Sequence, residues 1–460
     1  MKRQRTAQQK RVRLDSLQQI NLHAAGLDIG ATEIYACVPE ASAVENVRCF
    51  GTYTAALHQL ARWLQACAVD TVALESTGVY WIPLYEVLAE YSFELYLVNA
   101  RHVKNVSGRK SDILDCQWLQ QLHTYGLLQG SFRPSEDICT VRALVRHRDM
   151  LIRYRAAHIN HMQKALEQMN VKLTEVVADI TGVTGMGIIR AILRGERDPH
   201  TLAQYRQPGC RHSLIEIAQA LEGHYRHEHV FTLQQAVALY DAYSQQIRAC
   251  DAELEALYAQ FTPPVDLAEH PLPAATKRQR PGKGNRPTFD LRQALYQVAG
   301  TDLTQIDGVN VLVAQTIITE VGTDMSKWPT VKHFTSWLGL CPNNQITGGK
   351  VKRRGRRKTK SRAALALRMA AQSLNRSHSA LGAYYRRMRA KHGAEKANIC
   401  TAHKLARIIY QMLKNHSQYQ DIGPEAYDER FRQRRIRNLK RQAQQLGFTL
   451  QPDGSPTVVS

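Results

Sequence analysis

The sequence predicts an α/β domain near the N-terminus, followed by a longer region that is almost entirely helical. Two observations lead to this fold class. Up to about residue 130, short apolar runs alternate with amphipathic stretches, as expected of strands and helices that share one sheet. Beyond that point apolar residues recur at intervals of three and four, which is the spacing of helices that pack along one face.

The N-terminal apolar runs predict a sheet and its helices in a definite order. Residues 25–38 predict two strands that turn near Gly30. The next predicted elements are a strand at 47–53, a helix at 55–68, a strand at 71–74, a helix at 81–91 and a strand at 93–98. Three early strands, then helix, strand, helix and strand, is the order of a ribonuclease-H-like sheet.

Four carboxylates stand next to the ends of these predicted elements. Asp28 and Glu75 interrupt or end apolar runs, so each should emerge at a strand edge. Asp112 and Asp115 are spaced i, i+3, which places both in the first turn of a helix that Ser111 is predicted to cap. Any one of these acids alone is most simply a solvated loop residue. Together they would repel one another unless cations lay between them, so they predict a site for two Mg²⁺ ions, which suits phosphodiester chemistry.

Composition indicates a polyanionic partner. The chain has 460 residues with 61 Lys and Arg against 40 Asp and Glu, a net charge of +21. It lacks an apolar run of about 18 residues, and its first residues do not form a secretory signal, so we expect no membrane span and a cytoplasmic location. Nine cysteines without a CxxC pair argue against zinc ribbons and disulfides. The absence of a GxxxxGK[ST] loop predicts no nucleotide cofactor.

Changes in composition divide the chain into predicted segments. These are a basic arm (1–20), the acidic α/β catalytic domain (21–130), a helical coiled-coil region (131–265), a basic linker (266–290), a helical C-terminal domain (291–420) and a basic tail (421–460). The coiled coil is predicted from two apolar seams, and core packing is a far simpler explanation of them than a ligand pocket. The seams are Ile159, Met162, Leu166, Met169 and Leu173, and then Val237, Tyr240, Ile247, Leu254 and Leu257.

The C-terminal domain carries two candidate contacts with nucleic acid. The turn around Gly308 resembles a helix-hairpin-helix element, whose N–H groups bind phosphate, although a simple helix–helix turn also needs that glycine. Residues 350–362 hold nine cationic side chains among thirteen and lie inside a domain, which favours phosphate contact over a solvated tail. The predicted nucleic-acid-binding residues are Arg109, Lys110, Gly308, Gly348, Gly349, Lys350, Lys352, Arg353, Arg354, Arg356 and Arg357.

These motifs carry a family resemblance. In order and spacing, the four acids match the quartet of the DEDD transposases of bacterial insertion sequences, the Piv/MooV-like group of bridge-RNA-guided recombinases. Residues 337–350 resemble the C-terminal signature of that family, a Gly-Leu-x-Pro segment followed by a Ser-Gly pair and a basic stretch. The likeness runs from about residue 21 to 415.

The resemblance implies an RNase-H/RuvC-like catalytic domain, a coiled coil and a C-terminal transposase domain that supplies a nucleophile. It implies an enzyme that cuts and rejoins DNA at element ends and target, with a guide RNA encoded by the element. It also implies a homo-oligomer, either a dimer, which the seams favour, or a tetramer, associated with the bacterial nucleoid.

The chain departs from the family at the nucleophile. The family has a serine where this chain has Thr347, whose extra methyl group hinders attack and restricts χ1. Thr347 as a slower nucleophile, Ser361 in its place, or an inactive copy are the three interpretations. Two other classes of protein stay open. A metal-dependent junction nuclease that activates water would form no covalent adduct, and a nucleic-acid-binding relic would not need the acids.

Overall fold

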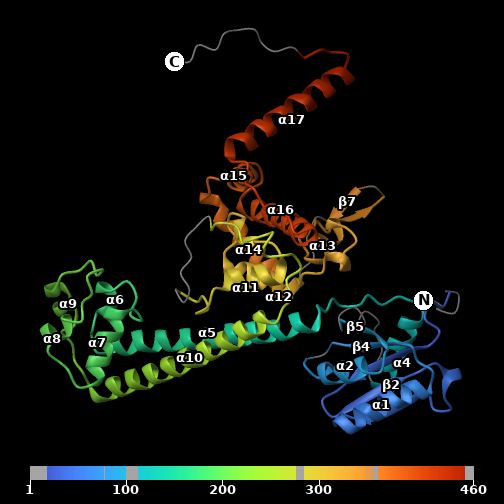
Figure 1. The fold of residues 1–460 in the computed structure, drawn as a ribbon, viewed down its shortest axis with the longest axis horizontal. Coiled ribbons are helices and arrows are strands. Elements are labelled where there is room, and N and C mark those ends of the chain that lie inside the picture. The colour runs from blue at the N-terminus through green and yellow to red at the C-terminus, as the bar shows by residue number, and fades with distance from the viewer. Residues whose placement is uncertain are drawn as a thin grey trace, which may run out of the picture. The chain divides into compact units, whose positions relative to one another are not determined.

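The computed structural model describes residues 18–76, 78–99, 112–275, 284–348, 350–353, 355 and 361–450. The chain separates into two compact units, Met1–Arg133 and Pro134–Ser460 (Figure 1). The first contains the predicted α/β domain, and the second contains the predicted helical regions.

The first unit is built on a five-stranded mixed sheet. Its strands are β1 (Ala24–Ile29), β2 (Glu33–Cys37), β3 (Val47–Gly51), β4 (Thr71–Glu75) and β5 (Glu94–Val98). Their spatial order is β3-β2-β1-β4-β5; the first three strands pair antiparallel, and β1, β4 and β5 are parallel. Among the described residues, the unit also contains helices α1 (Thr54–Ala66), α2 (Trp81–Ala89) and α4 (Asp112–Thr124) and the short 3-10 helix η2 (Glu40–Ser42). The predicted ribonuclease-H-like fold class is confirmed.

The two faces of this sheet are covered by different helices. On one face, Leu27 of β1 and Leu74 of β4 belong to a buried cluster with Leu60 of α1 and Leu84 of α2. On the other face, Ala73 and Val98 pack with Leu119 of α4. Successive side chains of a strand point to opposite faces, so each strand sends alternate residues toward α4.

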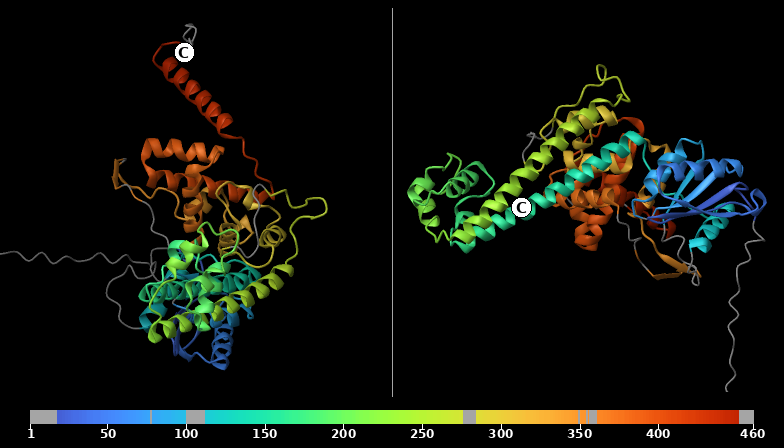
Figure 2. Two further views of the ribbon diagram at one scale, coloured as in Figure 1. Left: turned by 90° about the vertical axis from the view of Figure 1, so that its left-hand side faces the viewer. Right: turned by 90° about the horizontal axis from the view of Figure 1, so that it is seen from below.

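The second unit contains two long helices, α5 (Glu136–Gln168) and α10 (His227–Ala259), which lie side by side (Figures 1 and 2). Arg148 contacts Asp251 and His158 stacks on Tyr243, so the helices run antiparallel. The two predicted apolar seams therefore lie on helices that pack within one chain. Val237 and Tyr240 of α10 pack in one cluster with Met162 and Leu166 of α5. The homo-oligomer stays a prediction. Met169 and Leu173 lie beyond the end of α5, in the buried cluster at the far end of the pair.

Four short helices close that far end, namely α6 (Leu173–Val176), α7 (Val183–Leu193), α8 (Pro199–Ala203) and α9 (Leu214–Ala220). Toward the other end of the helix pair, a buried ion pair between Arg148 and Asp251 holds the chain segment around residues 285–288. Arg148 donates to the carbonyl of Asn285 at 2.9 Å, and the N–H of Thr288 donates to Asp251 at 3.1 Å. The C-terminal end of the predicted linker is thus fixed against the helix pair.

The rest of the unit is a helical domain with one hairpin. Its elements are α11 (Leu291–Ala299), η3 (Leu303–Gln305), α12 (Val311–Val321), η4 (Met325–Lys327), α13 (Val331–Trp337), β6 (Gln345–Thr347), β7 (Lys350–Arg353), α14 (Arg362–Ser373), η5 (Leu374–Arg376), α15 (Ala380–His392), α16 (Ala394–Asn415) and α17 (Pro424–Gln445). Helix α16 packs on α14 and α15, and α17 packs on α15. None of the described helices is long and apolar enough to span a membrane.

Candidate functional site

Asp28 and Glu75 lie at the ends of two adjacent parallel strands. The register pairs Leu27 of β1 with Leu74 of β4, and these acids are the next residue of each strand. Because Leu27 and Leu74 face α1 and α2, the alternation of the strands directs Asp28 and Glu75 to the opposite face, which α4 covers. The structure therefore brings these two predicted site residues to one place.

Helix α4 approaches this face unusually closely. A Cβ atom on Gly26 would lie 2.5 Å from the carbonyl oxygen of Cys116 and 2.3 Å from the amide nitrogen of Gln120. The glycine is therefore required for the backbone of α4 to rest on β1. This contact brings the first turns of α4 to the strand that carries Asp28.

The pKa of the Cys116 thiol depends on the same contact between α4 and the sheet. Its pKa is raised by a hydrogen bond with Cys37 first, then by burial, and also by the charges of Cys37 and Asp28. The negative charge of Asp28 is therefore felt inside α4, one residue after Asp115. Asp115 itself is exposed.

The acids form an oxygen-only set, which is the donor type that Mg²⁺ prefers. Asp28 and Glu75 share one face, and Asp112 begins α4, one turn before Asp115. Among the side chains that the structure describes, no three His, Cys, Asp or Glu residues are close enough to hold one metal ion. The side chains of Asp112 and the N-cap candidate Ser111 lie outside the described residues.

Thr347 lies at the tip of an exposed hairpin. It is the last residue of β6 and pairs with Lys350, the first residue of β7. The turn residue Gly348 has φ +56°, a left-handed conformation that favours glycine. The pair Ile346 and Val351 is also exposed, at 62% and 46%, so the hairpin is accessible on both faces. It holds the Thr347 hydroxyl at the surface of the second unit.

Two other predicted residues have structural explanations. Ser361 is the N-cap of α14, and its hydroxyl accepts a hydrogen bond from the N–H of Ala364 at 3.2 Å. Gly308 adopts φ +85° in the turn before α12, and a Cβ there would lie 2.7 Å from the carbonyl oxygen of Ala370. The glycine of the predicted hairpin thus allows close packing on α14.

The remaining predicted nucleic-acid contacts fall into two groups. Lys350 and Lys352 are exposed on β7, and Arg353 ends that strand. The residues outside the described part of the chain are Arg109, Lys110, Gly349, Arg354, Arg356 and Arg357.

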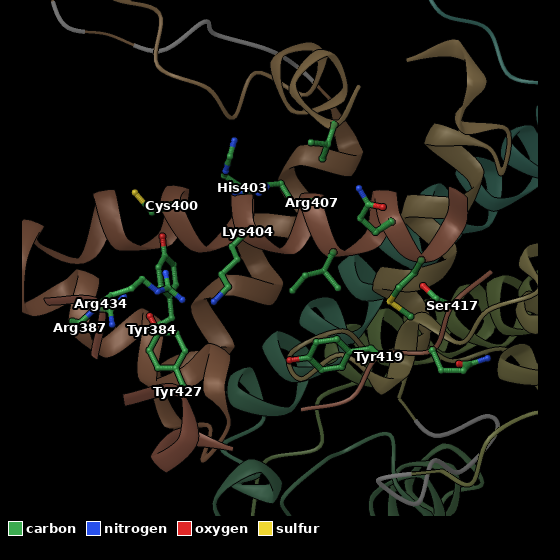
Figure 3. A pocket seen from close by; sticks show the side chains of 15 residues that line it. Tyr384, Arg387, Cys400, His403, Lys404, Arg407, Ser417, Tyr419, Tyr427 and Arg434 are labelled. Carbon is green, nitrogen blue, oxygen red and sulfur yellow. The ribbon is translucent and has the colours of Figure 1, made fainter. Parts of the chain in front are cut away.

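Sequence reasoning missed a cationic pocket between α15, α16 and α17 (Figure 3). The available signal was the pairing of aromatic and basic residues on one helix face, as in Tyr384 with Arg387 and Tyr427 with Arg434. That pattern is also common on solvated helices, so it did not single out a site.

Models of two known protein families match segments in the N-terminal and C-terminal halves of the chain. A family model described as a transposase, of the IS110 DEDD type, matches residues 25–171. A second model, described as the transposase of the IS116/IS110/IS902 family, matches residues 300–386. No curated protein matches the chain. A ribonuclease-H-like acidic domain followed by this second segment defines a DNA transposase. The chain belongs to the IS110 family of DEDD transposases.

Proposed function

We propose that this transposase cuts and rejoins the DNA strands of an insertion sequence by means of an acid quartet and the hydroxyl of Thr347. The observation that carries the proposal is the placement of Asp28 and Glu75 on adjacent strands, on the face against which α4 begins with Asp112. Acids held this way on a rigid sheet are arranged for a cation rather than for one another.

The residues that would hold Mg²⁺ are Asp28, Glu75, Asp112 and Asp115. Their carboxylates supply only oxygen, and the sheet fixes the first two while the first turn of α4 carries the others. A pair of bound Mg²⁺ ions would supply charge stabilisation at the scissile phosphate.

Thr347 is proposed to supply the nucleophile. Its oxygen forms a bond to phosphorus while the bond between phosphorus and the leaving DNA oxygen breaks, and the hydroxyl proton passes through solvent to that oxygen. A DNA hydroxyl later attacks the same phosphorus and releases Thr347. The protein–DNA ester keeps the energy of the broken bond, so no nucleotide cofactor is needed.

Basic residues beside Thr347 are proposed to hold the DNA backbone. Lys350 and Lys352 share the hairpin with the nucleophile, and the run continues to residue 362. The net charge of +21 supports a large nucleic-acid partner, for which we propose element DNA, target DNA and a guide RNA encoded by the element. A homo-oligomer associated with the nucleoid would bring two element ends together.

The decisive experiment traps the covalent intermediate. A suicide DNA substrate that loses its leaving strand is incubated with the protein and Mg²⁺, and the peptides are analysed by mass spectrometry. We expect a nucleotide adduct on Thr347 in the natural protein. Thr347→Ala should form none, whereas Thr347→Ser should form as much or more, because the hindering methyl group is removed.

Ser361→Ala is the matched control. It removes another hydroxyl of the same domain, at a cost of about 1 kcal/mol for the lost helix cap, and should keep the adduct. An adduct on Ser361 would reassign the nucleophile. Cleavage without any adduct would show that the acids activate water, as in a junction nuclease.

A further inference from the structure

A pocket of about 590 Å³ opens between α15, α16 and α17. In Figure 3, Lys404 projects from α16 toward the rings of Tyr384 and Tyr427, beside Arg387 and Arg434. Most of these residues lie beyond residue 386, where the second family match ends. The pocket is of the size that takes a nucleotide-sized ligand.

The lining of the pocket is strongly cationic. Arg387, Lys404, Arg407 and Arg434 all line it, together with His403, and no carboxylate among the described residues does so. Within the described part of the chain, no ion pair joins these four cations to an acid. Like charges gathered in one cavity repel one another, so an anionic ligand bound among them would relieve the repulsion.

Asp421, an acid near the pocket, already accepts several hydrogen bonds. Its carboxylate accepts hydrogen bonds from the N–H groups of Ala380 and Gly423 and from the hydroxyl of Tyr419, at 3.1 to 3.2 Å. It therefore holds the loop before α17 in place. Its charge still acts on Lys404 against those of Arg387, Arg434 and Arg407, so one carboxylate faces four cations and the pocket keeps an excess of positive charge.

Aromatic rings hold the cations in position. The ammonium nitrogen of Lys404 lies 4.5 Å from the ring centre of Tyr384 and 4.8 Å from that of Tyr427. The guanidinium carbon of Arg387 lies 4.9 Å from the Tyr427 ring and 3.6 Å from the Phe431 ring. Such cation–π contacts orient both groups without neutralising them. In addition, Nη1 of Arg387 is buried and has no hydrogen-bond partner.

Burial and the neighbouring charges change the pKa of the Lys404 ammonium group. Its pKa is lowered by burial first, and then by the charges of Arg387, Arg434 and Arg407, against the opposing charge of Asp421. An anion among these groups would reverse the electrostatic part of that effect. A phosphate has the charge and the oxygens to accept from both a guanidinium and an ammonium group.

We propose that this pocket binds one phosphate of a nucleic-acid strand and so anchors the strand to α15, α16 and α17. The proposal rests on the proposed function for its partner, because a transposase must hold DNA, but it does not depend on Thr347. A free phosphate ion is the alternative source of the same chemistry.

The test is the salt dependence of nucleic-acid binding by the full chain, measured by fluorescence anisotropy with single-stranded DNA, duplex DNA and RNA. Arg434→Ala should weaken binding and reduce the slope of log K against log salt by about 0.9 for duplex DNA, or about 0.7 for a single strand. Arg435→Ala is the matched control. Arg435 is the next residue of α17 and is also an exposed cation, but it does not line the pocket. Its slope should stay unchanged. Equal effects of the two changes would overturn the proposal.

A second variant, Lys404→Met, keeps the length of the side chain but removes its charge. Without ligand its melting temperature should be unchanged or higher, because like-charge repulsion is relieved, while its slope should fall like that of Arg434→Ala. If inorganic phosphate stabilises the natural protein at constant ionic strength but Lys404→Met leaves the slope unchanged, the ligand is a free ion and the proposal is wrong.

The proposed phosphate site and the proposed nucleophile Thr347 can be contradicted independently of each other. The slope requires only binding, so it can be measured even if no adduct forms on Thr347. Conversely, Thr347→Ala, which should form no adduct, should keep the slope of the natural protein.

Discussion

Asp28 and Glu75 are neighbours on the parallel strands β1 and β4, and both point to the face of the sheet that α4 covers. A cation bound at this face would be held by oxygens of both carboxylates. Amide substitutions keep the size of these side chains, so they separate metal binding from folding.

Asp28→Asn and Glu75→Gln should each abolish Mg²⁺-dependent stabilisation. Without Mg²⁺, their melting temperatures should stay close to that of the natural protein, because each amide keeps the size and one oxygen of the carboxylate that it replaces. The natural protein should gain stability with Mg²⁺ by mass action, and the variants should not. DNA cleavage should fall about 100-fold or more, while DNA binding persists. Thermal scans with and without Mg²⁺ and a cleavage assay measure these effects.

Glu94→Gln is the control for this pair. Glu94 begins β5, at the opposite end of the parallel strands, so its loss should leave both the Mg²⁺ response and cleavage intact. A full Mg²⁺ response in Asp28→Asn would remove Asp28 from the metal site.

Gly26→Ala should disturb the site through α4. The new methyl group would meet the backbone of Cys116 and Gln120 at 2.3 to 2.5 Å, and a backbone cannot move aside as a flexible side chain can. We expect a loss of about 1–3 kcal/mol, the usual cost of overpacking, and reduced cleavage because Asp115 moves with the helix. Hydrogen–deuterium exchange of the α4 amides should become faster.

Gly51→Ala provides the comparison. Its methyl group would meet only the Cβ of Ala56, at 3.8 Å, which is an ordinary contact. Exchange in α4 and cleavage should both stay normal. If Gly26→Ala behaves in the same way, α4 does not depend on close contact with β1.

His123 should make the first unit less stable in mild acid. Burial lowers the pKa of His123 from its ordinary 6.5 to about 4, against the opposing charges of Glu94 and Asp70. Thr71 donates its hydroxyl proton to the carbonyl of Glu94, so it accepts from Nε2–H of a neutral His123. Between pH 6.5 and 4 the unfolded chain binds a proton that the folded chain does not. Stability is therefore full above pH 6.5 and falls by about 3 kcal/mol as the pH decreases to 4.

An NMR titration of labelled histidine measures this pKa directly, and α4 amide exchange at pH 7.5 and pH 5 measures the stability. His123→Phe should flatten the pH dependence between these values. A pKa near 6.5 for His123 in the folded protein would contradict the prediction.

Local sequence determined the sheet and its acids. The apolar runs around Leu27 and Leu74 have the period of buried strands, and that period also decides that Asp28 and Glu75 point to the other face. The i, i+3 spacing of Asp112 and Asp115 likewise needs only the geometry of a helix. These features depend on residues close together in the chain, so a single sequence contains them.

Tertiary structure decided the partners of each surface. The seam of α5 specifies an apolar stripe but not its partner, and only the folded chain shows that α10 covers it. The hairpin of Thr347 escaped prediction because its strands are short and its pairing is local to an exposed tip. The pocket of Lys404 collects residues from α15, α16 and α17, which are brought together by the burial of apolar faces elsewhere on those helices. The periodicity of apolar residues predicts which face of a helix or strand is buried, but it does not predict which other element packs on that face.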